Sequence, residues 1–433
     1  MTSSNSTPMQ IHGTVAPGFE PVEALFRHEM RTLAEDNAQL CVYHRGEKVV
    51  DLWASRSADG SFSADSLVNV FSSGKSLEAI AVASLVSRGL LDYDAPITRY
   101  WPEFGAAGKD ELTVANLMRH EAGLANFDTS VHLQDLTPER IRENAVGRVI
   151  EGQAPRFGAD GEERRQYHAL TRGWIVNELF RRVDPDGRTI GQYLREEISG
   201  PLGADVVIGV RDEEMPRVAR VTILGIGYQL LQGLLPRFLG RRVVHNAFQV
   251  FSRLFKLLPL MLRGRKSGSA PPFADVPGMG FVNHPDFLRG ETPSANANCS
   301  ARGLARVAAM MAARGALAGR QFLSEEAWAA AHAHPLKASM GGLLTTRFTQ
   351  GGVDSFVPCG PGSTRMERDF NTGREGFYGW MGFGGSIFQW HPQREIGFAF
   401  VPTTLHSLDL LNERGKRYQA AVLNCIAAEN GAA

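Results

Sequence analysis

Cysteine is scarce in this chain, with four residues among 433: Cys41, Cys299, Cys359 and Cys425. They are widely scattered, no pair forms Cys-x-x-Cys, and no histidine stands near them at metal-ligand spacing. A disulfide framework or a zinc site needs closer sets of ligands than these. We therefore expect reduced core thiols, no metal and no cofactor.

The chain also lacks an excess of charge of either sign. Lys plus Arg and Asp plus Glu both number 46, and 43% of the residues are hydrophobic. This is the composition of a globular protein with one large or two moderate cores, and it gives no reason to expect a nucleic-acid partner. The first eight residues have neither a basic start nor an apolar run, so we expect no signal peptide and a cytoplasmic protein.

Acidic residues are missing from one long segment. Residues 215–274 contain no aspartate or glutamate but ten lysines and arginines among leucines, valines and phenylalanines. Three interpretations are open: an insertion packed on its own domain, which we favour, a lid over the substrate, or a contact with a membrane surface. As a lid, the segment would set the substrate preference through Phe248, Phe251, Leu254 and Phe255. Glycines and prolines interrupt the apolar runs, which excludes a bilayer-spanning helix.

Against these absences stands one well-defined motif, Ser72-Ser73-Gly74-Lys75. A β-branched run ends at Phe71, and an almost wholly apolar helix follows over residues 76–86, closed by Arg88 and Gly89. Such a helix belongs to the core, so its first turn is held rigidly. Unpaired backbone N–H groups at a helix start stabilise negative charge that develops on a nearby serine.

The spacing of Ser72 and Lys75 has a chemical meaning of its own. Residues three apart lie on one face of a helical turn, so the amine can reach the hydroxyl. Ser72 is the only serine that stands three residues before a lysine in this chain. A buried lysine is usually paired or has a lowered pKa, as a catalytic base requires. The alternative is that Ser72 caps the helix and Lys75 is solvated.

The remaining pattern indicates an α+β protein. After a loose lead-in over residues 1–20, we expect strands at 39–44, 48–53, 384–390 and 396–401, and helices at 21–35, 112–120, 167–183, 190–198, 300–318, 324–333 and 408–428. Strands at both ends and helices between them predict a sheet built from the two termini with a helical domain inserted. We place the sheet domain at 1–72 and 296–433, and the helical domain at 73–295.

Two further stretches supply what a serine nucleophile needs. Tyr167 heads the apolar helix predicted at 167–183, and a tyrosine near a lysine ammonium loses its proton more easily, so it could accept the serine proton. Trp380-Met381-Gly382-Phe383 precedes two more glycines at the start of a predicted strand, where a substrate carbonyl can approach the backbone. The alternatives are a core tyrosine with one hydrogen bond and a glycine-rich bulge.

Taken in this order, the motifs resemble those of the family VIII carboxylesterases, which are similar to class C β-lactamases and penicillin-binding DD-peptidases in fold and catalytic layout. The matching segments are Phe71-Ser72-Ser73-Gly74-Lys75, Gly89-Leu90-Leu91-Asp92-Tyr93-Asp94-Ala95-Pro96, His120-Glu121-Ala122-Gly123-Leu124, Tyr167-His168-Ala169, Gly200-Pro201-Leu202-Gly203 and Trp380-Met381-Gly382.

The resemblance implies a β-lactamase/DD-peptidase-like fold, with an antiparallel sheet flanked by helices. It implies Ser72 as nucleophile, Lys75 and Tyr167 as its activating pair, and the N–H groups of Ser72 and Phe383 as oxyanion hole. Trp380, Met381 and Gly382 would bind the substrate. The implied activity is that of a serine carboxylesterase that cleaves short acyl esters through an acyl-serine intermediate.

Two departures from the β-lactamase pattern bear on the substrate. Ala169 stands where those enzymes have asparagine, and Trp380-Met381-Gly382 replaces Lys-Thr-Gly. An indole cannot supply the charge that holds a substrate carboxylate, so neutral esters are favoured. A β-lactamase, a D-amino-acid peptidase or amidase, and a catalytically silent binding protein are the alternatives. No Gly-x-Ser-x-Gly elbow occurs, which argues against an α/β-hydrolase.

Overall fold

The structure, a computed structural model, describes residues 8–57, 59–157, 164–252, 255, 268–341 and 344–432. Leu254, one of the four residues named for the lid interpretation, lies outside the described residues. Within the described residues, no helix is both long enough and apolar enough to cross a bilayer.

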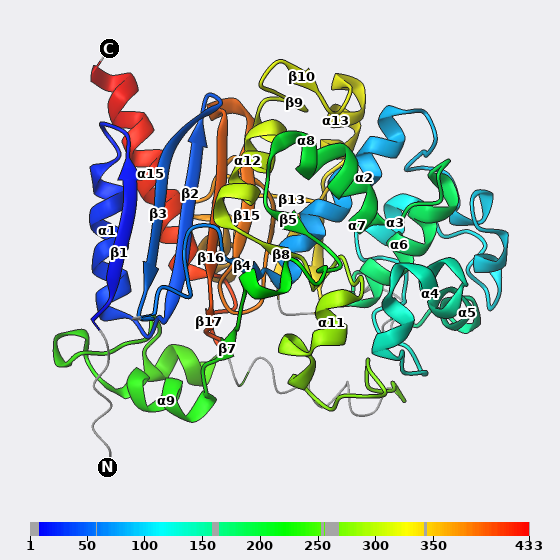
Figure 1. Ribbon diagram of the computed structural model, residues 1–433, viewed down its shortest axis with the longest axis horizontal. Helices are drawn as coiled ribbons and strands as arrows, with labels where there is room; N and C mark the ends of the chain where they lie inside the picture. Colours follow the sequence, from blue (N-terminus) through cyan, green and yellow to red (C-terminus); the bar gives the residue numbers. More distant parts are fainter. Residues whose placement is uncertain are drawn as a thin grey trace.

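The centre of the fold is a nine-stranded sheet in which every neighbouring pair is antiparallel. Its strands, in spatial order, are β1 (Gln10–Val15), β3 (Glu47–Ser55), β2 (Asn37–His44), β16 (Ile396–Pro402), β15 (Ile387–His391), β14 (Tyr378–Met381), β13 (Asp354–Ser355), β12 (Leu344–Phe348) and β11 (Leu336–Met340). The two ends of the chain meet where β2 pairs with β16 (Figure 1). The predicted sheet built from both termini is therefore confirmed.

Both faces of this sheet are covered, as the sequence of β16 requires. Phe398 and Phe400 belong to the core beneath α1 (Glu20–Thr32) and α15 (Glu413–Ala432), whereas Ala399 and Val401 belong to the core on the other face. Alternate residues of a strand point to opposite faces, so a strand covered on both sides is apolar throughout. On the second face lies α12 (Ala301–Ala312), which packs against β2, β15 and β16.

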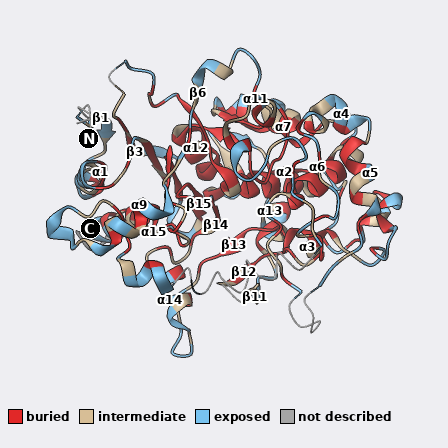
Figure 2. Cartoon of the chain, turned by 90° about the horizontal axis from the view of Figure 1, so that it is seen from below, coloured by how far each residue is buried: buried red, intermediate tan, exposed pale blue. Residues whose placement is uncertain are grey.

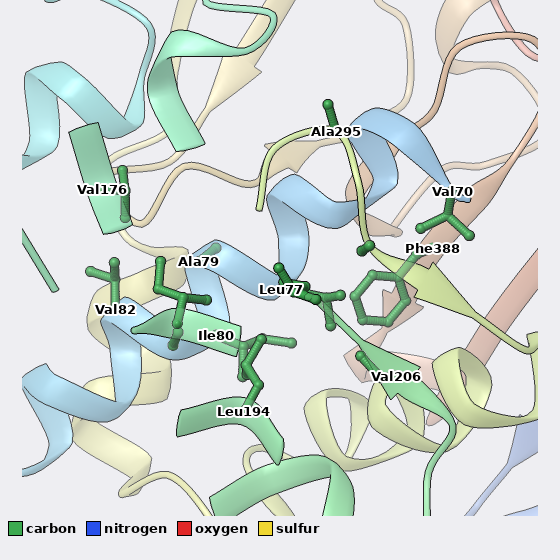
Figure 3. Packing of buried hydrophobic residues seen from close by; sticks show 14 of the residues in the cluster. Val70, Leu77, Ala79, Ile80, Val82, Val176, Leu194, Val206, Ala295 and Phe388 are labelled. Atoms are coloured by element: carbon green, nitrogen blue, oxygen red, sulfur yellow. The ribbon is translucent and has the colours of Figure 1, made fainter. Parts of the chain in front are cut away.

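The inserted part is mostly helical and contains α2 (Lys75–Ser87). Its other helices are α3 (Val114–Met118), α4 (Pro138–Arg142), α5 (Ala145–Gly152), α6 (Thr171–Val183), α7 (Ile190–Tyr193), α8 (Gly200–Leu202), α9 (Ile226–Leu234) and α11 (Pro285–Arg289). Of these, α6 and α7 pack against α2. Leu77, Ile80 and Val82 of α2 contact other apolar side chains from several elements (Figure 3). The helix ends as predicted, with Gly89 in the left-handed region at φ +67°.

Shorter elements complete the architecture. A four-stranded sheet joins β5 (Val206–Val207), β8 (Asn298–Cys299), β4 (Leu67–Asn69) and β6 (Val218–Ala219); β7 (Thr222–Ile223) pairs with β17 (Thr404–Leu405), and β9 (Ala316–Leu317) with β10 (Arg320–Gln321). Two helices, α13 (Glu325–His332) and α14 (Arg365–Asn371), precede the last strands of the large sheet.

Several predicted boundaries were wrong. The lead-in contains β1, the helix predicted at 167–183 begins at Thr171, that at 300–318 ends at Ala312, and that at 408–428 begins at Glu413. The helix predicted at 190–198 is one α-turn, α7, continued by a π-helical turn over Leu194–Ser199. Trp380 and Met381 end β14 rather than begin a strand. The domain boundaries at 72/73 and 295/296 stay predictions.

Candidate active site

Ser72 lies in a tight 3₁₀ turn, Phe71–Gly74, that joins β4 to α2. Phe71 enters this turn at φ +48°, a region that residues with a side chain rarely adopt. Its N–H donates to Asn69 Oδ1 at 2.8 Å, which helps to hold the strained residue. The turn thus presents the Ser72 side chain from a rigid junction between a strand and a buried helix.

Lys75 is fully buried, with 0% of its surface exposed, and its amine reaches Ser72 as the spacing predicts. Nζ lies 3.2 Å from Ser72 Oγ, and it donates to the carbonyl oxygens of Ala169 at 2.7 Å and Ser294 at 3.0 Å. Burial holds the pKa of Lys75 well below its ordinary value, an effect that Glu78 opposes and Arg172 reinforces. Burial therefore favours the neutral form of this amine.

The number of partners bears on what the neutral form of this amine can do. A neutral amine has two N–H donors and one lone pair. In that form the carbonyls of Ala169 and Ser294 take both donors, and the lone pair faces Ser72 Oγ, whose hydroxyl can then donate to Nζ. This is the arrangement of a general base and its nucleophile. The position that holds asparagine in β-lactamases, here Ala169, contributes its backbone carbonyl instead.

Tyr167 meets this pair, although it precedes α6 rather than starting it. Lys75 Nζ lies 4.8 Å from the centre of the phenol ring, and Tyr167 Oη accepts a hydrogen bond of 2.9 Å from Trp380 Nε1. Burial raises the pKa of Tyr167 to about 12, and hydrogen bonds with Ser72 and Trp380 only partly oppose this. Burial therefore opposes the easy ionisation of Tyr167 that the sequence analysis expected. Tyr167 is a neutral phenol.

The segment that follows β14, with Phe383 and Ser386, packs against the turn that carries Ser72. Ser386 Oγ donates to Val70 O at 2.7 Å and lies 3.0 Å from Ser73 Oγ, and the rings of Phe71 and Phe383 meet edge to face at 5.8 Å. Among the described residues, the Phe383 N–H has no recorded acceptor. Its position beside the Ser72 turn is compatible with the predicted oxyanion hole.

Gly382 is required by this close approach. A Cβ atom at this position would stand 2.2 Å from Val70 O and 2.1 Å from Ser386 Oγ. Asn412 Nδ2 then fixes the turn by donating to Gly382 O at 3.0 Å and to Ser386 O at 2.8 Å. Sequence analysis missed Ser294, Ser386 and Asn412, because each acts on residues far away in the chain and none stands in a motif.

Trp380 and Met381, predicted to bind substrate, are both buried. The Trp380 indole packs against the ring of Phe348, and its N–H is used by Tyr167. Met381 Sδ lies 3.5 Å from Arg374 Nη1. Their role in substrate binding stays a prediction.

A buried polar network supports the base of the site. Arg172 and Glu78 form an ion pair at 2.9 Å between α6 and α2, with both side chains 0% exposed. The same guanidinium donates to Lys75 O at 3.0 Å. His120 Nδ1 accepts from the His168 N–H at 3.1 Å and so fixes the segment that carries Tyr167. The network ties the nucleophile's helix to the tyrosine segment.

The fold and this site define a class, the serine hydrolases with a Ser-x-x-Lys nucleophile on a β-lactamase-like scaffold. A family model described as "Beta-lactamase" matches residues 22–423, and the chain belongs to that family. It is 30% identical over 410 residues to Esterase/beta-lactamase LipL of Mycobacterium tuberculosis, covering 92% of this chain and 84% of LipL.

Solved structures agree with this assignment. A family VIII carboxylesterase superposes with a TM-score of 0.73 at 26% identity, and a penicillin-binding protein homologue from Caulobacter crescentus with 0.72 at 28%. Each comparison covers 96% of this chain and 100% of the other. The predicted fold class and family resemblance are confirmed, and the relatives support an enzyme, a serine ester hydrolase.

Proposed function

We propose that this protein hydrolyses short acyl esters through an acyl-enzyme on Ser72, with Lys75 as general base and Tyr167 as proton carrier. The observation that supports this most directly is the buried amine of Lys75, whose two carbonyl partners leave its lone pair for the Ser72 hydroxyl. The esterase names of the relatives agree with the reaction class.

In the first half of the proposed reaction, Ser72 Oγ attacks the ester carbonyl carbon while its proton passes to Lys75 Nζ. The carbonyl oxygen becomes an oxyanion, which accepts hydrogen bonds from the N–H groups of Ser72 and Phe383. When the C–O bond to the alcohol breaks, the leaving alkoxide takes the phenol proton of Tyr167. The Lys75 ammonium then restores that proton, so the alcohol leaves neutral.

In the second half, a water molecule attacks the acyl-serine and gives its proton to Lys75. The tetrahedral intermediate collapses to the free acid, and Ser72 Oγ regains its proton from the ammonium. A buried amine with a lowered pKa suits both halves, since burial favours the free base that accepts the proton and makes the ammonium a stronger acid that returns it.

The test compares Ser72→Ala with Ser73→Ala, which removes the neighbouring hydroxyl. Wild-type protein should react with a fluorophosphonate, and peptide mass spectrometry should locate the label on Ser72. Ser72→Ala should lose the label and roughly 10³-fold or more of its activity on p-nitrophenyl butyrate. Ser73→Ala should keep the label. Wild-type protein that is neither labelled nor active would instead be a silent binding protein, and activity retained in Ser72→Ala would refute the assignment.

A further inference from the structure

The distribution of polar and apolar side chains on α9 is the reverse of the one usual for a surface helix of a globular protein. Its buried residues are Gln229 and Gly233, and the Gln229 amide donates to Leu224 O at 2.7 Å and Ser407 Oγ at 3.0 Å. The opposite side of the helix exposes Leu231 at 67% and Leu234 at 66%. A surface helix normally buries its leucines and exposes its amides.

The residues that follow extend this apolar surface. Together, Ile226, Tyr228, Leu231, Leu234, Phe238, Leu239, Phe248, Phe251 and Phe255 make up most of the large apolar side chains exposed in the described part of the chain. We call them the α9 surface. In Figure 1 α9 lies below the large sheet, and Figure 2, seen from below, shows exposed residues around it. Single exposed leucines are common, whereas a concentration of this kind marks an interaction site.

Positive charge borders the α9 surface. Arg237, which directly precedes Phe238, is exposed and has no acidic partner among the described residues. The pKa of Arg241 is lowered, first by burial and then by the positive charges of Arg237 and Arg417. Since residues 215–274 contain no acidic side chain, no carboxylate of this segment offsets the cluster. The surface is therefore apolar in its middle and cationic at its edge.

From this pairing of exposed apolar and cationic groups we propose that the α9 surface docks on an anionic lipid membrane. Phenylalanine and leucine side chains would enter the boundary between headgroups and acyl chains, while the arginines would bind lipid phosphates. A second copy of this chain is a poorer occupant, because its own residues 215–274 would bring further arginines and no carboxylate to pair with them. A lid facing the substrate would have these side chains covered rather than solvated.

The segment that carries the α9 surface is joined to the rest of the fold near the candidate site through β7, which pairs with β17. After β17, the His406 N–H donates to Gly384 O at 3.0 Å, next to Phe383. Docking would therefore hold the enzyme with this end of the molecule against the bilayer. The inference does not rest on the catalytic roles, and its test measures binding alone.

The experiment is flotation of the full-length protein with vesicles of phosphatidylcholine, with or without phosphatidylglycerol. Wild-type protein should float with the anionic vesicles, much less with neutral ones, and less again in about 0.5 M salt. Leu231→Ser with Phe238→Ser, and separately Arg237→Glu, should each weaken partition on the order of tenfold. Leu336→Ser on β11 and Arg320→Glu on β10 are matched controls at exposed positions and should bind as wild type does.

Equal thermal unfolding of all variants would show that they are folded, since every replaced side chain is exposed. The proposal is overturned if wild-type protein does not bind anionic vesicles, or if it binds neutral vesicles equally well. It is also overturned if the α9 variants bind like the controls. Self-association in analytical ultracentrifugation that Phe238→Ser abolishes, without vesicle binding, would assign the surface to a second copy of the chain.

Discussion

At the scale of single residues, two buried lysines of this chain show what sets the charge state of an amine. Lys109 donates to three carbonyl oxygens, those of Ala106, Glu151 and Gln153, which suits an ammonium with three N–H groups. Burial lowers its pKa to about 8. Lys75 also has three partners, two carbonyls and the Ser72 hydroxyl, and burial holds its pKa well below the ordinary value. Because a hydroxyl can donate as well as accept, this third partner allows Lys75 to lose a proton and act as a base.

The lowered pKa of Lys75 in the folded protein predicts that the free energy of unfolding depends on pH. Unfolded Lys75 takes up a proton below its ordinary pKa of 10.5, whereas the folded amine does not. Stability therefore falls as pH falls from 10.5 toward the folded pKa, by about 1.4 kcal/mol per pH unit. In Lys75→Met this contribution is absent, so the wild-type unfolding free energy, relative to the variant's, should rise as the pH is raised toward 10.5 in urea titrations.

Lys109→Met is the control for this measurement. Because the folded pKa of Lys109 is about 8, its contribution should depend on pH only above that value. A difference between wild type and Lys75→Met that does not change with pH would mean that Lys75 is charged in the folded protein. The proposed general base would then be wrong.

The contact between Ser72 and Lys75 could be predicted because it is local, three residues along one turn. The position of Tyr167 before α6 and its protonation state could not be predicted. Its sequence neighbours are apolar at helical spacing, but the peptide N–H of His168 donates to His120, 48 positions away, instead of starting a helix. The pKa of Tyr167 likewise depends on burial by residues from other elements.

At the scale of elements, the ion pair of Arg172 and Glu78 joins α6 to α2 in the core. Arg172→Met would leave the Glu78 carboxylate buried without its partner, and we expect a loss of about 3–5 kcal/mol in the free energy of unfolding. Arg289→Met, which breaks the exposed pair with Asp212 at 2.9 Å, should cost about 1 kcal/mol or less. Denaturant titration of both variants makes the comparison, and equal losses would show that the buried pair does not hold these helices together.

The turn after β14 offers a second test at this scale. In Gly382→Ala the new methyl group would collide with Val70 O, so the Phe383 N–H should move away from the Ser72 turn. Losing one oxyanion donor costs about 10²–10³ in kcat. Gly152→Ala adds a methyl group with no atom within 4 Å and should keep full activity on p-nitrophenyl butyrate. Full activity in Gly382→Ala would remove Phe383 from the oxyanion hole.

Elements with strong local patterns were predictable, and those held by distant partners were not. The hairpin of β2 and β3 and the buried helix α2 follow from their apolar spacing. The edge strand β1 has mostly exposed residues and Gly13, so no alternation marks it, and only its pairing with β3 makes it a strand. The apolar run at 408–412 is not helical, because Asp409 binds the N–H of Glu413 and starts α15 there.

At the scale of the whole molecule, the arrangement of charge bears on the choice of substrate. Three arginines precede the Trp380 motif and could in principle replace the missing lysine. Their recorded partners are protein groups: Arg365 meets Asp369, Arg368 donates to Ser363 O, and Arg374 donates to Leu411 O. Arg374 is also fully buried. Burial withholds Arg374 from a substrate carboxylate, whereas Arg365 and Arg368 are exposed side chains of α14.

This distribution predicts discrimination between neutral and anionic substrates. Desolvating a carboxylate without a charge-assisted hydrogen bond costs about 1.5–3 kcal/mol, or about one to two decades in kcat/KM per bond. We expect p-nitrophenyl butyrate to be turned over well and p-nitrophenyl hydrogen succinate, which adds a carboxylate to the same leaving group, to be poorer by at least that factor. Penicillins should be poor or inert. Penicillin hydrolysis as efficient as that of the butyrate would contradict the prediction and favour a β-lactamase.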